Sequence, residues 1–176
     1  GPASVTAVDG KGRWARFAGG GVEAEASLES PGGGTFVRQA LSADGRVIAL
    51  TDGDRLYAGR VTKPKSVVSL PMPLRDVRCL TLSPSGNRAA IAGENTVLVM
   101  RLSDGRVLCR SERAEAPDFV HFAGPNRLLI FTPRRLMLLS VMSDEVVWQR
   151  PAEGRSSPVD VAVAEVNGFA GEADQP

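Results

Sequence analysis

The candidate metal ligands in the sequence are three aspartates that recur at an even spacing of 42 residues: Asp76, Asp118 and Asp160. Carboxylate oxygens are the ligands that hard cations such as Ca²⁺ prefer, so a fold that brought the three together would offer a cation site. Aspartate also accepts backbone hydrogen bonds in turns. We favour the turn role, because the aspartates do not keep a constant distance from the apolar anchors of the repeats. The distance from Asp76 to Leu82 is two residues longer than the distance from Asp118 to Phe122. No metal site is therefore predicted, and these three residues are the candidates should one exist.

Residues that could carry out catalysis are scarce. His121 is the only histidine, so a nucleophile-base-acid triad or a histidine-rich zinc site would depend on it alone. Ser42, Ser83 and Ser140 stand in turn-like or apolar runs, outside the strand-turn-helix setting of a nucleophile elbow. No GxxxxGK[ST] phosphate loop occurs in the sequence. We predict a protein that is not an enzyme and that has no cofactor.

The charge balance and the cysteines exclude several classes of partner. The 21 Lys and Arg residues are balanced by 20 Asp and Glu, so no strong field attracts nucleic acid or an anionic membrane. No stretch approaches the ~18 uncharged apolar residues that a membrane span needs. Cys79 and Cys109 lie in apolar runs without a CxxC spacing, which favours small buried side chains in a reducing compartment. We predict a cytoplasmic protein that recognises another protein, and neither nucleic acid nor a membrane.

The elements that would position these residues form a repeat of about 40 residues. Three segments align, QALSADGRVIAL, CLTLSPSGNRAAIA and VHFAGPNRLLIF, and their apolar anchors are Leu41, Leu82 and Phe122. Each unit holds four runs of about four to seven residues, joined by short turns with Gly, Asn, Asp or Pro, a pattern typical of antiparallel hairpins and not of helices. The Asp-Gly pairs at 44–45 and 104–105 accept the positive φ of tight turns. The sequence therefore predicts an all-β chain of four-stranded meanders.

A small sheet repeated at this interval cannot bury its faces until a neighbouring sheet packs against it, as the blades of a β-propeller do. On the LSADG and LSPSG turns, and on the MRLSDGR run that stands where the family has Trp-Asp-Leu-x-x-Gly, the chain resembles the WD-repeat propellers. It departs from them at the Trp-Asp pair, which is replaced by Gly59-Arg60, Met100-Arg101 and Leu139-Ser140, and it lacks a Gly-His dipeptide. The resemblance implies an all-β propeller of four-stranded antiparallel blades with divergent repeats. In such blades Trp14 and Trp148 are expected to pack in the core or between blades.

The two ends of the chain divide one further repeat between them. Residues 1–2 are interpreted as the remnant of a cleaved tag, 3–165 as the propeller and 166–176 as a C-terminal tail. The whole blades are predicted at 35–71, 76–112 and 118–150, and a split blade combines 4–29 with a strand at 158–165. We predict four blades, with the C-terminal strand closing the N-terminal blade. The alternative is a segment of a larger ring, completed by another copy or by another chain.

The predicted binding site is one rim of this propeller. In propellers that resemble this chain, the loops that join one blade to the next and the loops between second and third strands share a rim that commonly binds partners. Here those loops carry prolines and six arginines, one of which is Arg155. The five predicted to bind a partner are Arg75, Arg113, Arg134, Arg135 and Arg150. Arginine is enriched in interface hot spots, and prolines lower the entropy lost on binding. Acidic residues at 54, 94, 112, 115 and 153 lie among them, so a solvated rim without a partner is the alternative.

The predicted function is a non-catalytic interaction or scaffold module. Its partner would be another protein or other domains of the same polypeptide. Two alternatives stay open. One is a propeller that binds a metal or a small ligand at the channel mouth, and the other is a partial propeller that completes itself by forming a homo-oligomer.

Overall fold

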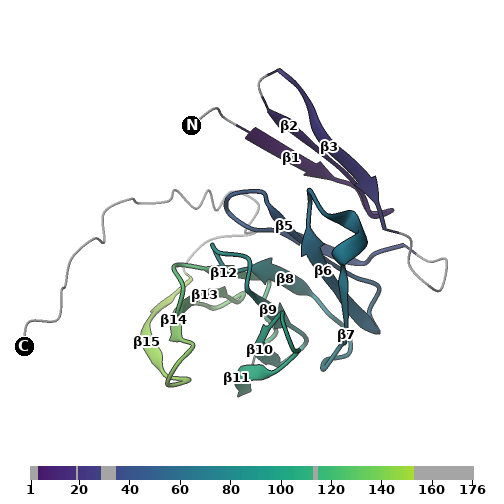
Figure 1. Ribbon diagram of the computed structural model, residues 1–176. Coiled ribbons are helices and arrows are strands. Elements are labelled where there is room, and N and C mark those ends of the chain that lie inside the picture. The colour runs from purple at the N-terminus through teal and green to yellow at the C-terminus, as the bar shows by residue number, and fades with distance from the viewer. Residues whose placement is uncertain (1–3, 19, 29–34, 113–114, 153–176) are drawn as a thin grey trace, which may run out of the picture.

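The computed structural model describes residues 4–18, 20–28, 35–112 and 115–152, which fold into four antiparallel sheets (Figure 1). The first sheet contains β1 (Ser4–Val8), β2 (Arg13–Ala18) and β3 (Gly21–Ser27). The second contains β4 (Arg38–Leu41), β5 (Val47–Thr51), β6 (Arg55–Arg60) and β7 (Val68–Pro71). The third contains β8 (Cys79–Leu82), β9 (Arg88–Ala92), β10 (Thr96–Arg101) and β11 (Val107–Glu112). The fourth contains β12 (Phe119–Phe122), β13 (Arg127–Phe131), β14 (Arg135–Ser140) and β15 (Val146–Pro151).

Within every sheet, each strand pairs with the strand that follows it along the chain. The described residues add a single helical turn, the 3-10 helix η1 (Pro64–Ser66), and contain no helix long and apolar enough to span a membrane. These observations confirm the predicted all-β fold of four-stranded antiparallel meanders. The first sheet shows three strands, and the strand predicted at 158–165 lies outside the described residues. Its pairing with the first sheet stays a prediction.

Two glycine turns explain why the LSADG and LSPSG segments recur. Gly45 and Gly86 adopt positive φ, +63° and +67°, and each donates its N–H to the carbonyl oxygen of the serine three residues earlier at 2.8 Å. A Cβ on Gly86 would lie 2.6 Å from the Val47 side chain of the second sheet. A Cβ on Gly45 would lie 2.8 Å from Thr6 Oγ1 of the first sheet. Glycine is thus needed at both turns for the backbone conformation and for the close approach of the preceding sheet.

Three hydrophobic clusters fill the spaces between consecutive sheets. Between the first and second sheets, Trp14 is buried with Phe36 and Tyr57, and its indole N–H donates to the Val61 carbonyl oxygen at 3.2 Å. This is the packing between blades that the sequence predicts for Trp14. The other two clusters join the second sheet to the third, through Leu56, Ala58, Leu98 and Met100, and the third to the fourth, through Val97, Val99, Leu128 and Leu139.

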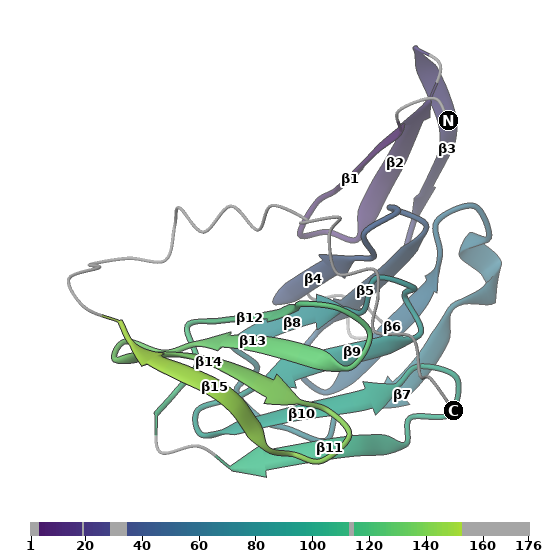
Figure 2. The same ribbon diagram turned by 90° about the vertical axis from the view of Figure 1, so that its left-hand side faces the viewer.

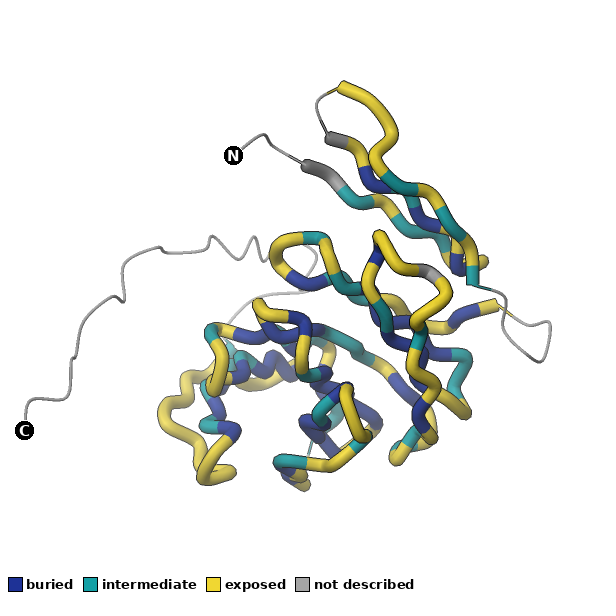
Figure 3. The backbone as a smooth tube through the Cα atoms, viewed as in Figure 1, coloured by how far each residue is buried: buried dark blue, intermediate teal, exposed yellow. Residues whose placement is uncertain are grey.

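The burial of each strand follows its place in this row of sheets. The first five residues of β10 are all buried, because the third sheet has a neighbouring sheet on each face. In β14 the residues from Leu136 onward alternate between half-buried and buried, and β15 is exposed along its whole length (Figure 3). An uninterrupted apolar run such as VLVM, at 97–100, therefore marks a strand that is covered on both faces.

Figure 1 and Figure 2 show the sheets side by side in chain order. The first strands of the complete sheets lie next to one another, with β8 in contact with both β4 and β12, and the fourth strands β7, β11 and β15 lie on the outside. The first sheet stands at one end of the row and the fourth sheet at the other. The loops that leave the strands therefore gather at two ends of the sheets.

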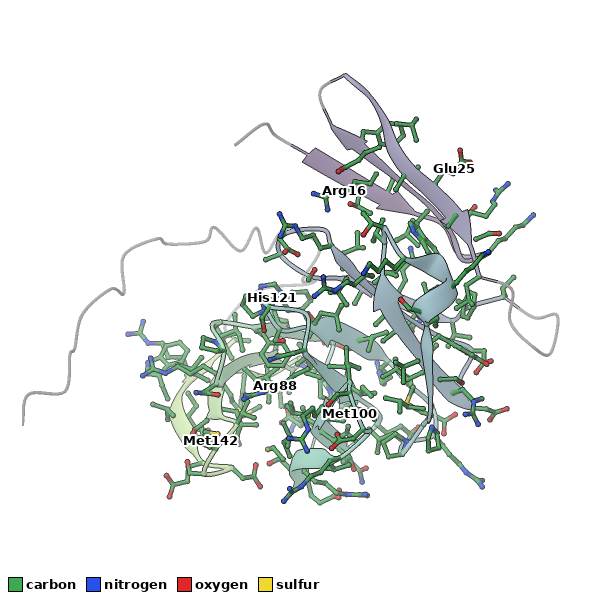
Figure 4. All side chains as sticks on the ribbon, viewed as in Figure 1. Arg16, Glu25, Arg88, Met100, His121 and Met142 are labelled. Atoms are coloured by element: carbon green, nitrogen blue, oxygen red, sulfur yellow. The ribbon has the colours of Figure 1, made fainter. Side chains whose placement is uncertain are left out.

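The substitution Met100→Ala should lower the free energy of unfolding by about 2 to 5 kcal/mol, because it opens a cavity between the second and third sheets. Met100 is 1% exposed, whereas Met142, in the turn between β14 and β15, is 74% exposed (Figure 4). Met142→Ala is the matched control and should change this free energy by no more than about 0.5 kcal/mol. Urea unfolding followed by circular dichroism measures both variants. Equal effects of the two substitutions would contradict the packing described here.

Candidate functional site

The loops predicted to form a binding rim lie at one end of the sheets. In an antiparallel meander, the turn between the second and third strands and the connection that leaves the fourth strand reach the same end. The Met72 N–H, after β7, donates to the Asp54 carbonyl oxygen in the β5–β6 turn at 2.9 Å. The Ala152 N–H, after β15, donates to the Arg134 carbonyl oxygen in the β13–β14 turn at 2.8 Å. We call this end the arginine rim, after Arg75, Arg134, Arg135 and Arg150.

Three of the rim arginines lie together at the end of the fourth sheet. Arg134 ends the β13–β14 turn, Arg135 pairs with Pro151, and Arg150 pairs with Leu136. Arg135 and Arg150 therefore leave this end of the sheet on opposite faces. The Arg150 guanidinium lies over the Trp148 ring, 5.3 Å from its centroid, which is a cation-π contact. Adjacent segments thus present three guanidinium groups, one of them held on an aromatic face.

A single described acidic side chain pairs with this group of arginines. Glu115 Oε1 lies 3.9 Å from Arg134 Nη1, at the limit of an ion pair. The other carboxylate oxygen of Glu115 accepts a hydrogen bond from Thr132 Oγ1 at 2.7 Å. Between described residues, no ion pair involves Arg135 or Arg150. The positive charge at this end of the fourth sheet is therefore only partly neutralised.

The other acidic residues of the rim belong to different sheets. Glu112 accepts a hydrogen bond from Thr96 Oγ1 at 2.8 Å. That bond, followed by one from the Arg110 guanidinium, holds the pKa of the Glu112 carboxyl below its usual range. Asp54 and Glu94 are exposed in the turns of the second and third sheets. The rim is thus mixed in charge over the second and third sheets and mainly positive at the fourth.

Arg75 stands apart from this group, in the connection between β7 and β8. Leu74 and Val77 on either side of it pack into the cluster between the second and third sheets, and Arg75 is exposed. A Cβ on Gly93 would lie 3.2 Å from the Arg75 carbonyl oxygen, so the connection rests on the β9–β10 turn. Arg113, the remaining predicted rim residue, lies outside the described residues.

The predicted aspartates do not occupy equivalent places. Asp118 lies one residue before β12, whereas Asp76 lies three residues before β8 and adopts a left-handed φ of +53°. Arg78 takes the place in the third sheet that is equivalent to Asp118, and its Nη2 lies 3.7 Å from Asp118 Oδ1. Asp160 lies outside the described residues. Within the part of the chain that the structure describes, no three His, Cys, Asp or Glu side chains are grouped so as to hold a metal ion.

A chain of polar contacts along the inner strands was not predicted from the sequence. Arg38 Nε donates to the Arg78 carbonyl oxygen, and the Arg78 guanidinium pairs with Asp118. Arg78 and Asp118 each stand four residues before their apolar anchors, Leu82 and Phe122. The repeats should have been aligned on these anchors and not on the 42-residue spacing of the aspartates. That alignment makes Arg78 equivalent to Asp118 and predicts an arginine beside it.

The side chains considered for catalysis serve the fold. The backbone N–H groups five residues further on donate to Ser42 Oγ and Ser83 Oγ, at 2.9 and 3.1 Å, and so close the turns after β4 and β8. Ser140 Oγ likewise accepts a backbone hydrogen bond at 3.4 Å. The His121 ring stacks on Phe119 with centroids 6.0 Å apart. These roles favour the prediction that the chain is not an enzyme, which stays a prediction.

Comparison with known proteins places the chain by its fold. No family model matches the sequence, and no curated protein does. The fold is similar to that of BamB from Moraxella catarrhalis, with a TM-score of 0.62 and 13% identity over 82% of this chain and 44% of that chain. For hydrazine synthase of Kuenenia stuttgartiensis the TM-score is 0.57 and the identity 15%, over 80% of this chain and 43% of that chain. For a chain of the mitotic checkpoint complex the values are 0.62 and 11%, over 83% and 47%.

These likenesses show the fold alone, because the identities are low. The chain is a divergent β-propeller, as its repeats predict, and its four sheets are consistent with four blades. It spans less than half the length of each of these three structures.

We expect titration with Ca²⁺ to give no heat and no shift in melting temperature, because Arg78 places a positive charge beside Asp118 and Asp76 lies out of position. Calorimetry and differential scanning fluorimetry at millimolar Ca²⁺ measure the two quantities. Asp104→Asn is the control, since a hydrogen bond from Arg101 lowers the pKa of the Asp104 carboxyl to about 2 and keeps it ionised. A stoichiometric heat that Asp118→Asn removes and Asp104→Asn preserves would contradict this expectation.

Proposed function

We propose that this chain is a non-catalytic interaction module that binds an acidic segment, of a protein partner or of another domain in the same polypeptide, through the arginine rim. The observation that carries the proposal is the grouping of Arg134, Arg135 and Arg150 at the end of the fourth sheet. Guanidinium groups bind carboxylates through paired hydrogen bonds and are enriched among the residues that dominate interface energies. The charge that Glu115 leaves unneutralised is available to such a segment.

The rim is well suited to binding because little of it must become ordered. Pro133 and Pro151 have fixed φ values, and the hydrogen bond from Ala152 to the Arg134 carbonyl oxygen joins the two segments that carry the arginines. The Arg150 side chain is already oriented by Trp148. Side chains that are ordered before binding lose less entropy on binding, and a larger share of the contact energy then appears as affinity.

The fold by itself is compatible with either an interaction module or an enzyme. One of the similar structures is that of an assembly, the mitotic checkpoint complex, and another is that of hydrazine synthase. The turn roles of Ser42 and Ser83 favour the non-catalytic reading for this chain. Neither Cys79 nor Cys109 forms a disulfide with a described residue, which favours the cytoplasm as the compartment in which the module acts.

The proposal is tested with a short fluorescein-labelled peptide rich in glutamate, whose binding is followed by fluorescence anisotropy. The double variant Arg134→Glu with Arg135→Glu should weaken binding by about tenfold or more, which is ~1.4 kcal/mol, because it reverses two charges at the centre of the site. Added salt should also weaken binding by the wild-type chain, since the attraction is between exposed charges.

The control is the double variant Arg60→Glu with Arg127→Glu, which changes the net charge by the same amount. Arg60 ends β6 and Arg127 begins β13, so both lie at the opposite end of the sheets, where both are exposed. This variant should bind like the wild-type chain. The proposal fails if the wild-type chain does not bind the peptide, or if the two double variants lose affinity equally.

A further inference from the structure

The outward side of the fourth sheet is an apolar surface that no described sheet covers. Register places Leu129 beside Leu138 and Leu138 beside Trp148, all on one side of the sheet. Phe131 is buried, the leucines are half-buried and Trp148 is 38% exposed. None of the hydrophobic clusters between the described sheets includes these residues. We call this surface the trailing face, and it consists of Phe119, Leu129, Phe131, Leu136, Leu138 and Trp148.

The third sheet shows what covers such a face. The residues at the same places in its strands are Cys79, Ala90, Ala92, Val97, Val99 and Cys109, and all six pack against the fourth sheet. Ala90, Ala92, Val97 and Val99 are fully buried there. The equivalent side chains of the fourth sheet are larger, and they have more apolar surface to remove from water. The trailing face therefore has the position and the composition of a surface on which a following sheet packs.

The first sheet has the complementary surface at the other end of the row. Register places Ala7 beside Ala15 and Phe17 beside Val22, on the side opposite Trp14. Phe17 is 42% exposed and Val22 58% exposed. We call these four residues the leading face, because the equivalent side of the third and fourth sheets receives the preceding sheet. Its two alanines leave room for bulky side chains such as those of the trailing face.

We propose that two copies of this chain close one ring, in which the trailing face of each copy packs on the leading face of the other. The two faces stand at opposite ends of the row of sheets (Figure 1, Figure 2). A head-to-tail contact of this kind closes after two copies when each spans half of the ring. The chain covers 44%, 43% and 47% of the three similar structures, so two copies approach the size of one such propeller.

This pairing goes beyond the proposed function. Arg150, which lies over Trp148, borders the trailing face, but the substitutions that test the two proposals differ. The arginines Arg134 and Arg135 lie in the β13–β14 turn and at the start of β14, at the rim end of the sheet. The contact between copies uses Leu129, Leu138 and Phe17, which lie within the strands β13, β14 and β2. Loss of peptide binding and loss of pairing are therefore separate results.

The experiment measures the mass of the 176-residue chain in solution by light scattering after size exclusion, over a range of micromolar concentrations. The wild-type chain should have the mass of two copies. Leu138→Glu and Phe17→Glu should each lose that mass and run as single copies, because each places a charge in both contacts of the ring. Circular dichroism checks that the variants keep their β structure. If Leu138→Glu loses its β structure, Phe17→Glu still tests the contact between copies.

Two controls separate the ring from other assemblies. Met142→Glu adds the same charge at an exposed turn residue outside both faces, and this variant should keep the mass of two copies. An equimolar mixture of Leu138→Glu and Phe17→Glu chains retains one unaltered contact per pair, so pairing should partly return as the concentration rises. A single-copy wild-type chain, an open polymer, or pairing that Phe17→Glu leaves intact would each overturn the proposal.

Discussion

The structure depends on the burial of one sheet against the next. A four-stranded sheet of this kind has two apolar faces and no means of covering either, so it gains its stability from its neighbours. In the third sheet, Val97 and Leu98 are adjacent in β10 and point to opposite faces, and both are completely buried, one against the fourth sheet and the other against the second. Each such side chain contributes about 1.5 to 3 kcal/mol by leaving water.

This constraint divides the loops into two groups. At one end of the sheets the turns are packed against the preceding sheet, and Gly45 and Gly86 show how little freedom that contact leaves. At the other end, the loops of the arginine rim carry exposed side chains whose identity the packing does not dictate. A surface that is held in place by the fold, yet free to vary, is where a repeat protein can acquire a partner.

The same constraint is unmet at the two ends of the row. Leu138 and Phe17 stand in positions that are covered by another sheet wherever the chain has one, and here no described sheet covers them. Six mostly large side chains gather on the trailing face, and the leading face combines Phe17 and Val22 with two alanines. Each of the similar structures is more than twice the length that this chain matches. This size is one reason for the proposal that a second copy covers both end faces.

Local chemistry in the sequence determined the strands, their turns and their repeat. The alternation around Leu82 and the Ser-to-Gly turns at 83–86 require no knowledge of distant residues, because hairpin pairing and positive φ are set within a few positions. The tertiary structure decided which side chains meet. Asp76 and Asp118 share a spacing but not a place, and Arg78 lies beside Asp118. Trp148, expected to pack in the core or between blades, lies on a face that no described sheet covers. These outcomes depend on how each strand is aligned and on which sheet lies next to it, and sequence spacing along one chain records neither.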